Sequence, residues 1–222
     1  AKGDYIAYSD GDDFWTDPFK LQKQVDFLDN NQDCIIVSHN YSILNESMNQ
    51  LDQNNKFHDD FRYNQEKYLL DWVTQPLTCM FRNFFKDYTL LNKEDIFCDV
   101  ILFYELLKHG DGYFMNSNMA TFRVHQSALS SGLSRGQWLR NHVIMFDHLY
   151  KSNKRDDLLL KLSRNYCLSL YIYEIQNKRS MNNDFKPLRE YLKRTRRFQS
   201  RIFTLIVRAP YYIIRHGLIS RL

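Results

Sequence analysis

The order of the predicted elements constrains the fold of this 222-residue chain more than any other feature. Short apolar runs alternate with helical repeats as far as residue 135, and from Gln137 onward the pattern is helical almost to the end. Strands mixed with helices predict an α/β core, and a run of helices alone predicts a separate helical part. We therefore expect an α/β domain over residues 1–135 and a helical C-terminal extension over residues 136–222.

Five apolar runs are short and bounded by polar residues, which is typical of buried strands. They cover residues 5–9, 34–41, 77–81, 112–116 and 119–125. Helices are predicted after the start signal Thr16-Asp17-Pro18, over residues 65–73, and over residues 97–109, where Gly110 closes the helix. The polar segments 45–64 and 126–136 are expected to be loops.

The charges divide unevenly along the chain. Residues 1–120 carry 10 basic and 20 acidic side chains, whereas residues 121–222 carry 20 basic and 6 acidic ones. The acidic front half favours a bound cation, and the basic end favours an anionic partner. The alternative for the basic end is a solvated helical surface.

Four cysteines are present, at positions 34, 79, 98 and 167, and none forms a CxxC pair. Irregular spacing argues against a zinc site or a disulfide framework, so we expect buried free thiols and a reducing, cytoplasmic compartment. The sequence shows no apolar run of about 18 residues, the length that a membrane-spanning helix needs.

Three carboxylates follow the first predicted strand, in the segment Asp10-Gly11-Asp12-Asp13. Ligands of open α/β sheets bind beyond the carboxyl ends of the strands. Close carboxylates repel one another unless a cation relieves them, and oxygen ligands suit Mg²⁺ or Mn²⁺. Mg²⁺ also takes substrate phosphates as ligands, so this loop could hold a nucleotide diphosphate. The alternative is a solvated acidic turn.

The segment AKGDYIAYSDGDDFWTDPFKLQKQVDFL resembles the metal-binding segment of family 2 glycosyltransferases, which have the GT-A fold. The match rests on the Gly-x-Tyr-Ile-Ala strand, the acidic DxD-type motif, an aromatic pair and a Lys-Leu-x-x-Gln helix. The resemblance implies a mixed sheet flanked by helices and transfer of a sugar from a nucleotide-sugar donor. It also implies that Asp10, Asp12 and Asp13 bind the donor diphosphate, with Asp12 or Asp13 as the direct ligand of Mn²⁺ or Mg²⁺.

The resemblance continues to about residue 135. FCDVILFYELLKHGDGYF resembles the segment that carries the family's catalytic Asp, and the matching residue is Asp99. MATFRVHQSALSS resembles a later Tyr-Arg-x-His segment, in which Phe122 replaces the Tyr while Arg123 and His125 keep the polar positions. The resemblance implies that Asp99 is catalytic and that Arg123 and His125 belong to the donor side.

Asp99 stands at the start of a predicted helix, where the helix dipole favours the ionised form that a general base needs. Its alternative is a first-turn Asp without a catalytic role, and Glu94 and Asp95 are nearby rivals. No second carboxylate stands out as a nucleophile, which favours an inverting reaction. Arg123 and His125 occupy alternate positions of a strand and share a face, so either could reach the diphosphate. Their alternative is a surface Arg and a partly buried His.

The chain departs from the family pattern in one respect. In the family, a nucleotide-binding half with a βαβ region precedes the acidic motif, whereas here the motif begins at residue 10. The chain therefore resembles the C-terminal part of such an enzyme, and we expect these 222 residues to be inactive alone.

The leading hypothesis is an inverting glycosyltransferase that moves a sugar, from a UDP-sugar, to a hydroxyl of a glycan or lipid-linked acceptor in cell-surface polysaccharide synthesis. One alternative is a metal-dependent nucleotidyltransferase, although the Gly-rich basic loop of that class is not seen. Another is a non-catalytic module that binds membrane surfaces. No nucleic-acid partner is expected, because the aromatics do not interleave with basic residues in an RNA-binding motif.

Residues 191–222 carry eight basic side chains and no acidic one. Arg194, Arg201, Arg208 and Arg215 are spaced by seven and form one stripe of a helix, which Pro210 should kink or split. A basic face beside an apolar face suits a helix that lies on an anionic membrane, so we expect a peripheral protein at the inner face of the cytoplasmic membrane. The alternative is a helix that packs its apolar side on the catalytic domain.

Overall fold

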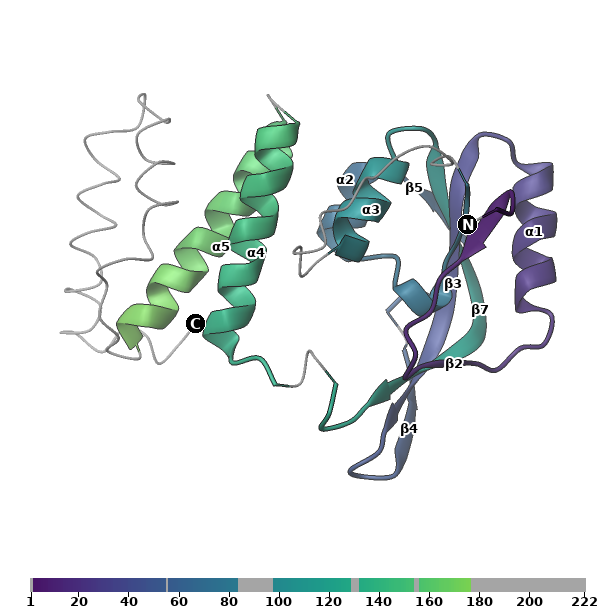
Figure 1. Cartoon of the computed structure of the whole chain (residues 1–222), viewed down its shortest axis with the longest axis horizontal. Helices are drawn as coiled ribbons and strands as arrows, with labels where there is room; N and C mark the ends of the chain where they lie inside the picture. Colours follow the sequence, from purple (N-terminus) through teal and green to yellow (C-terminus); the bar gives the residue numbers. More distant parts are fainter. Residues whose placement is uncertain (1, 55, 84–97, 129–131, 154–155, 177–222) are drawn as a thin grey trace. The chain divides into compact units, whose positions relative to one another are not determined.

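The computed structural model describes residues 2–54, 56–83, 98–128, 132–153 and 156–176 (Figure 1). The chain divides into two compact units, residues 1–132 and residues 133–222. The first unit is an α/β domain, whose strands are β1 (Tyr5–Ala7), β2 (Phe14–Trp15), β3 (Cys34–Asn45), β4 (Gln50–Gln53), β5 (Phe61–Tyr63), β6 (Met80–Arg82) and β7 (Asp111–Val124). Its helices are α1 (Lys20–Asn30), α2 (Gln65–Asp71), the short 3-10 helix η1 (Pro76–Thr78) and α3 (Cys98–Leu106).

The strands form one mixed sheet in the order β1-β6-β3-β7-β2, with β4 added to β3 and β5 added to β7. Only β3 and β7 run parallel among the pairs, and the others are antiparallel. Helix α1 covers one face, and α2 and α3 lie over the other (Figure 1). The α/β fold class, with a mixed, curled sheet flanked by helices, is therefore confirmed and is consistent with a GT-A-like fold.

The sheet's register changes in the middle of its longest pair. His39 lies opposite Met115, but Ser42 lies opposite Thr121, so β7 advances six residues while β3 advances three. Asn116 lies within this irregular stretch. Its backbone N–H donates to Asp60 Oδ1 (2.7 Å), and its side-chain Oδ1 accepts from Asn40 Nδ2 (2.8 Å). Bulges of this kind bend a strand and redirect its side chains.

Helix α1 packs through apolar side chains repeated at helical spacing. Val25 and Leu28 meet Cys34 and Val37 of β3 and Met80 of β6, in a cluster that also includes Tyr5, Ala7, Phe27, Tyr113 and Met115. Arg82 ties the end of the same helix to the sheet, since its guanidinium donates to the carbonyl oxygens of Leu28, Asn31 and Cys34. Arg82 thus adds a donor to the carbonyls of Leu28 and Asn31, which also accept from the backbone N–H groups of Asn31 and Cys34.

The opposite face of the sheet is aromatic. Tyr63 is buried and its hydroxyl hydrogen bonds with Thr74 Oγ1 at 2.6 Å, while Tyr68 of α2 meets Phe103 of α3 edge to face. A Cβ at Gly112 would lie 2.3 Å from the ring of Tyr63, so only glycine lets β7 pass under this ring.

A buried polar layer lies where α1 begins. Lys20 is 1% exposed, and its Nζ lies 4.3 Å from the centre of the Trp15 ring and donates to Gln24 Oε1 (2.9 Å). Gln24 Nε2 donates to the carbonyls of Val37 and Thr78. The Lys-x-x-x-Gln pair therefore joins α1, β3 and η1. Burial lowers the pKa of His39, beside this layer, to about 3, so its ring is neutral.

The structure corrects three sequence-based expectations. The segment 45–64 contains β4 and β5 rather than an irregular loop, because β4 folds back on β3 as a hairpin and β5 pairs with β7. The two strands expected at 112–116 and 119–125 are one strand, β7, whose polar central residues cover the bulged stretch. The strand expected at 77–81 begins later, at Met80, because Pro76 starts a 3-10 turn.

The second unit contains the helices α4 (Arg135–Ser152) and α5 (Asp157–Gln176) within its described residues. The Ser134 hydroxyl accepts from the Gln137 backbone N–H, and the Gln137 side-chain oxygen accepts from the Ser134 backbone N–H, which is a capping box. His142 of α4 stacks on Tyr166 of α5 with ring centroids 4.6 Å apart. The basic tail expected to bind membranes lies outside the described residues. Over the part of the chain that is described, no helix is both long and apolar enough to span a bilayer.

The cysteines at positions 34, 79 and 167 are buried and free, as the sequence predicts. Burial raises the pKa of Cys79 to about 12 and that of Cys167 to about 11. These thiols therefore stay protonated at neutral pH and are poor nucleophiles.

We predict a pH signature from the buried Lys20. Burial lowers its pKa from 10.5 to about 8 in the folded state. Between these two pH values, Lys20 is protonated to a larger extent in the unfolded chain than in the folded protein. The free energy of unfolding therefore increases as the pH rises from about 8 to about 10.5. Denaturant titrations across this range should show a steeper rise for the wild type than for Lys20→Met. Parallel pH profiles of the two proteins would contradict the assignment.

Candidate functional site

The acidic loop leaves the end of β1 and leads into β2, which pairs with the far end of β7 (Figure 1). The Asp13 backbone N–H donates to the Asp10 carbonyl at 3.3 Å, which turns the loop back on itself. A Cβ at Gly11 would meet no atom within 4 Å, so the top of the loop is open. The loop therefore presents its carboxylates at a strand end, as the sequence predicts.

Arg123 and His125, at the end of β7, both contact this loop. The Arg123 backbone N–H donates to Asp13 Oδ1 (2.9 Å), and its Nη1 donates to the Asp12 carbonyl (3.1 Å). His125 Nε2 lies 3.0 Å from Asp12 Oδ2, and His125 Nδ1 lies 2.8 Å from Ser127 Oγ. Asp12 and Asp13 thus lie together with Arg123 and His125, although more than 100 positions separate the two pairs in the sequence. All four are residues that the sequence proposes for the donor side.

The carboxylates of the loop have unequal environments. Burial, and then the charge of Asp12, raise the pKa of Asp10. Burial also raises the pKa of Asp13, against the hydrogen bond from the Arg123 backbone. In contrast, the hydrogen bond from His125 lowers the pKa of Asp12. The loop therefore concentrates negative charge that the protein neutralises only in part.

The residues of the loop fit a divalent cation. Asp13 Oδ2 is buried and has no hydrogen-bond partner, so this carboxylate oxygen is available to bind a cation. Within the described residues, no group of three or more His, Cys, Asp and Glu side chains is arranged to hold a metal ion. A site made of Asp12 and Asp13 would therefore leave most positions to phosphate oxygens and water, which is the usual way that proteins bind Mg²⁺.

Asp99 lies in the first turn of α3, as the sequence predicts, and is electrostatically linked to the acidic loop. Burial raises its pKa, backbone hydrogen bonds at the helix start lower it, and the charge of Asp10 raises it further. The charge of Asp10 is the smallest of these effects. Its rivals Glu94 and Asp95 lie outside the described residues.

Trp15 follows the acidic loop in β2, and its side chain is part-exposed (38%). Its indole Nε1 donates to the Leu77 carbonyl at 3.0 Å, and Lys20 sits over its ring. These contacts place Trp15 between β2, η1 and the buried polar layer. They hold the indole ring in one orientation.

Sequence reasoning missed Glu46. It begins the turn between β3 and β4, and its carboxylate accepts from Arg123 Nε at 2.8 Å and also from Nη2. The segment 45–64 was expected to be a loop, and no motif marks Glu46. If residues 45–53 had been predicted as a hairpin, Glu46 would have been placed at a strand end. Its pairing with Arg123 still could not have been predicted, because it depends on the tertiary fold.

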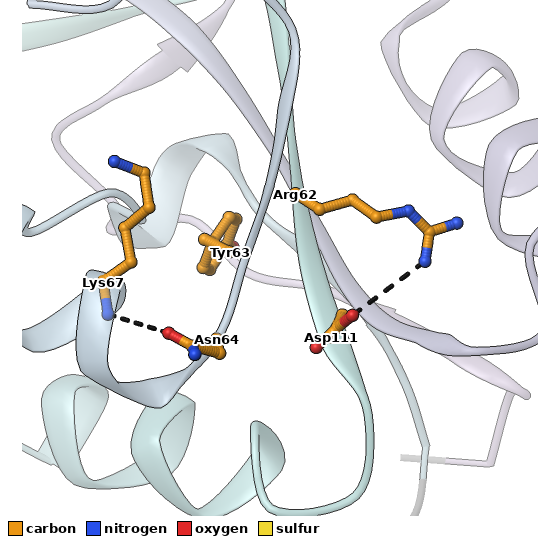
Figure 2. Close-up of a pocket in the computed structure, with 5 residues that line it drawn as sticks. All are labelled: Arg62, Tyr63, Asn64, Lys67 and Asp111. Carbon is orange, nitrogen blue, oxygen red and sulfur yellow. Dashed lines mark hydrogen bonds and ion pairs between the residues drawn. The ribbon is translucent and has the colours of Figure 1, made fainter.

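A second polar depression lies near the start of β7, at the other end of that strand (Figure 2). It has a volume of about 280 Å³ and is lined by Arg62, Tyr63, Asn64, Lys67 and Asp111. Its cations already have anionic neighbours, since Arg62 pairs with Asp33 and Asp111, and Lys67 pairs with Asp71. None of the site residues proposed from the sequence lines this depression.

Comparison with known proteins gives one family match, to the model described as "Glycosyl transferase family 2", over residues 1–89. Similar proteins include "Uncharacterized protein Rv1520" of Mycobacterium tuberculosis and "Uncharacterized protein Mb1547" of Mycobacterium bovis. Each is 44% identical over 46 residues, which is 21% of this chain and 13% of the relative. The chain thus matches only a small part of these relatives. The family match includes the acidic loop and ends before Asp99, and it supports a family 2 glycosyltransferase domain over residues 1–89.

Proposed function

We propose that the protein is an inverting glycosyltransferase that transfers a sugar from a nucleotide-diphosphate donor to a hydroxyl group. The observation that carries the proposal is the convergence of Arg123 and His125 on the acidic loop of a chain segment that matches family 2 glycosyltransferases. Cationic and anionic groups at one strand end suit a ligand that combines phosphates with a divalent cation.

Asp12 and Asp13 would hold Mn²⁺ or Mg²⁺, with Asp10 as a third carboxylate of the loop. A bound cation would neutralise the charge of the departing nucleoside diphosphate. Two side chains of the protein would complete the site. Arg123 offers hydrogen-bond donors that suit phosphate oxygens, and His125 orients the Asp12 carboxylate through the 3.0 Å contact.

Asp99 is proposed as the general base that takes the proton from the acceptor hydroxyl as it attacks the anomeric carbon. Its raised pKa suits this role, because a base with a pKa closer to neutrality transfers protons more effectively. The influence of Asp10 on this pKa supports a location near the donor. The sequence points to no second, nucleophilic carboxylate, which favours inversion at the anomeric carbon.

We further propose a UDP-sugar as donor and a glycan or lipid-linked acceptor in the synthesis of bacterial surface polysaccharide. We also propose that the 222 residues act as part of a larger enzyme and are inactive alone. Strand β1 stands at the edge of the sheet and pairs only with β6 among the described strands, which leaves an edge for a further strand. The experiments below therefore use the full-length protein.

We predict that Asp13→Asn, alone or combined with Asp12→Asn, weakens Mn²⁺ binding and metal-dependent release of nucleoside diphosphate by at least about 10-fold. The amide lacks the charge that a divalent cation requires. Asp52→Asn, an exposed carboxylate of β4, serves as the matched control and should behave as the wild type. Unchanged metal-dependent turnover in the double variant would overturn the metal site.

We predict that Asp99→Asn lowers kcat by about 100-fold or more while donor binding stays nearly intact. Because the pKa of Asp99 is raised, the acidic limb of the pH–rate profile should lie above 3.8, the ordinary value for Asp. Turnover should fall as pH drops through this raised pKa, since the protonated carboxyl cannot accept the proton. If Asp99→Asn lost donor affinity but kept a normal turnover at saturating donor, Asp99 would be a donor-binding residue and not the general base.

Residues 191–222 are proposed to hold the enzyme at the inner face of the cytoplasmic membrane. Each basic side chain near an anionic leaflet contributes about 1 kcal/mol, so the eight present could anchor it. Sedimentation with anionic liposomes should decrease strongly for a version that ends at Lys193, and the difference should shrink at higher salt. Equal sedimentation of the two proteins at low and moderate salt would exclude the tail as the anchor.

A further inference from the structure

Glu46 is held at the rim of the acidic loop by the sheet itself. Asn45, the last residue of β3, lies opposite Val124 in the parallel ladder, and the Glu46 backbone N–H donates to the Val124 carbonyl at 3.1 Å. The Asn49 backbone N–H closes the turn on the Glu46 carbonyl (3.3 Å). The main chain at Glu46 is therefore fixed relative to the end of β7.

The Glu46 carboxylate determines where the Arg123 guanidinium lies. Glu46 Oε1 accepts from two nitrogens on one edge of the guanidinium, Nε at 2.8 Å and Nη2, while Nη1 donates to the Asp12 carbonyl at 3.1 Å. Arg123 thus spans the gap between the β3–β4 turn and the acidic loop. Two anchors on separate segments define one orientation for a side chain that is otherwise long and flexible.

This pair contributes little to folding. The side chains of Arg123 and Glu46 are 37% and 38% exposed, and ion pairs at such exposed positions have small effects on stability. What the pair changes is the conformational freedom of the guanidinium, and a group held in place before a ligand arrives loses less entropy on binding.

The pair also separates charges. Asp12 and Asp13 lie beside Arg123. The hydrogen bond from His125 has the largest effect on the pKa of Asp12, and burial has the largest effect on that of Asp13, while the charge of Arg123 lowers both by the smallest of the effects that act there. A guanidinium without Glu46 would be drawn to these carboxylates and would compete with a cation for them. Glu46 balances the charge of Arg123 and leaves the carboxylates of the loop available.

We propose that Glu46 is a positioning residue of the donor site: it orients Arg123 for binding the diphosphate and keeps its guanidinium off the side-chain carboxylates of Asp12 and Asp13. This inference rests on the proposed function. It extends the site to the β3–β4 turn.

The test measures binding of uridine diphosphate with Mn²⁺, and of Mn²⁺ alone, by titration calorimetry on the full-length protein. Glu46→Gln should weaken diphosphate binding about 3- to 10-fold, with an unchanged Tm. The matched control is Asp33→Asn, which breaks another exposed carboxylate–Arg pair, with Arg62, near the opposite end of β7. This control should bind as the wild type does. In an Arg123→Ala background, Glu46→Gln should have no further effect.

Three results would overturn the inference. Wild-type affinity in Glu46→Gln would show that Arg123 needs no orientation by Glu46. An equal loss in the Arg123→Ala background would show that Glu46 acts without Arg123. A Tm lowered in parallel with affinity would indicate a structural role. A wild-type protein that binds neither Mn²⁺ nor the diphosphate would instead refute the proposed function, and this inference with it.

Discussion

The parallel pairing of β3 with β7 is the constraint on which the rest of the domain depends. These two strands are the longest of the sheet, and every other strand except β1 pairs directly with one of them. Their far ends bring three distant segments together: the acidic loop through β2, the β3–β4 turn through Glu46, and the end of β7 through Arg123 and His125. Parallel strands need a long crossover, and this one contains α3, which carries Asp99.

Local patterns were enough to predict the α/β class, the helices α1, α2 and α3, and the acidic loop at a strand exit. They failed where pairing with a distant partner decided the structure. The polar segment before β5 carries few strand-forming residues, yet β4 is stable because β3 offers it an edge. Strand β7 appeared as two strands because Asn116 and Asn118 interrupt its apolar pattern, and their side chains bond to neighbouring segments instead.

The candidate site shows the same division. Its carboxylates and the pair Arg123 and His125 could be predicted because family 2 glycosyltransferases carry similar motifs. Their mutual contacts could not, since those depend on the register of β7. The role of Glu46 could not be predicted from the sequence. Neither could the burial of Lys20, because lysine side chains are rarely buried. Around Lys20, a polar layer joins α1 to the sheet: Lys20 donates to Gln24, and Gln24 and Trp15 donate to the carbonyls of Val37, Thr78 and Leu77.

The bulged middle of β7 has a consequence for how such a domain can change in evolution. Side chains alternate between the two faces of a strand, so the pairing of β7 with β3 beyond the bulge determines which face Arg123 and His125 occupy. A one-residue slip of that pairing would turn both side chains away from the acidic loop, although the strands could still pair. The bulged stretch between Met115 and Thr121 already absorbs three additional residues and leaves the pairing beyond it regular, so the length of β7 can vary there without moving the site.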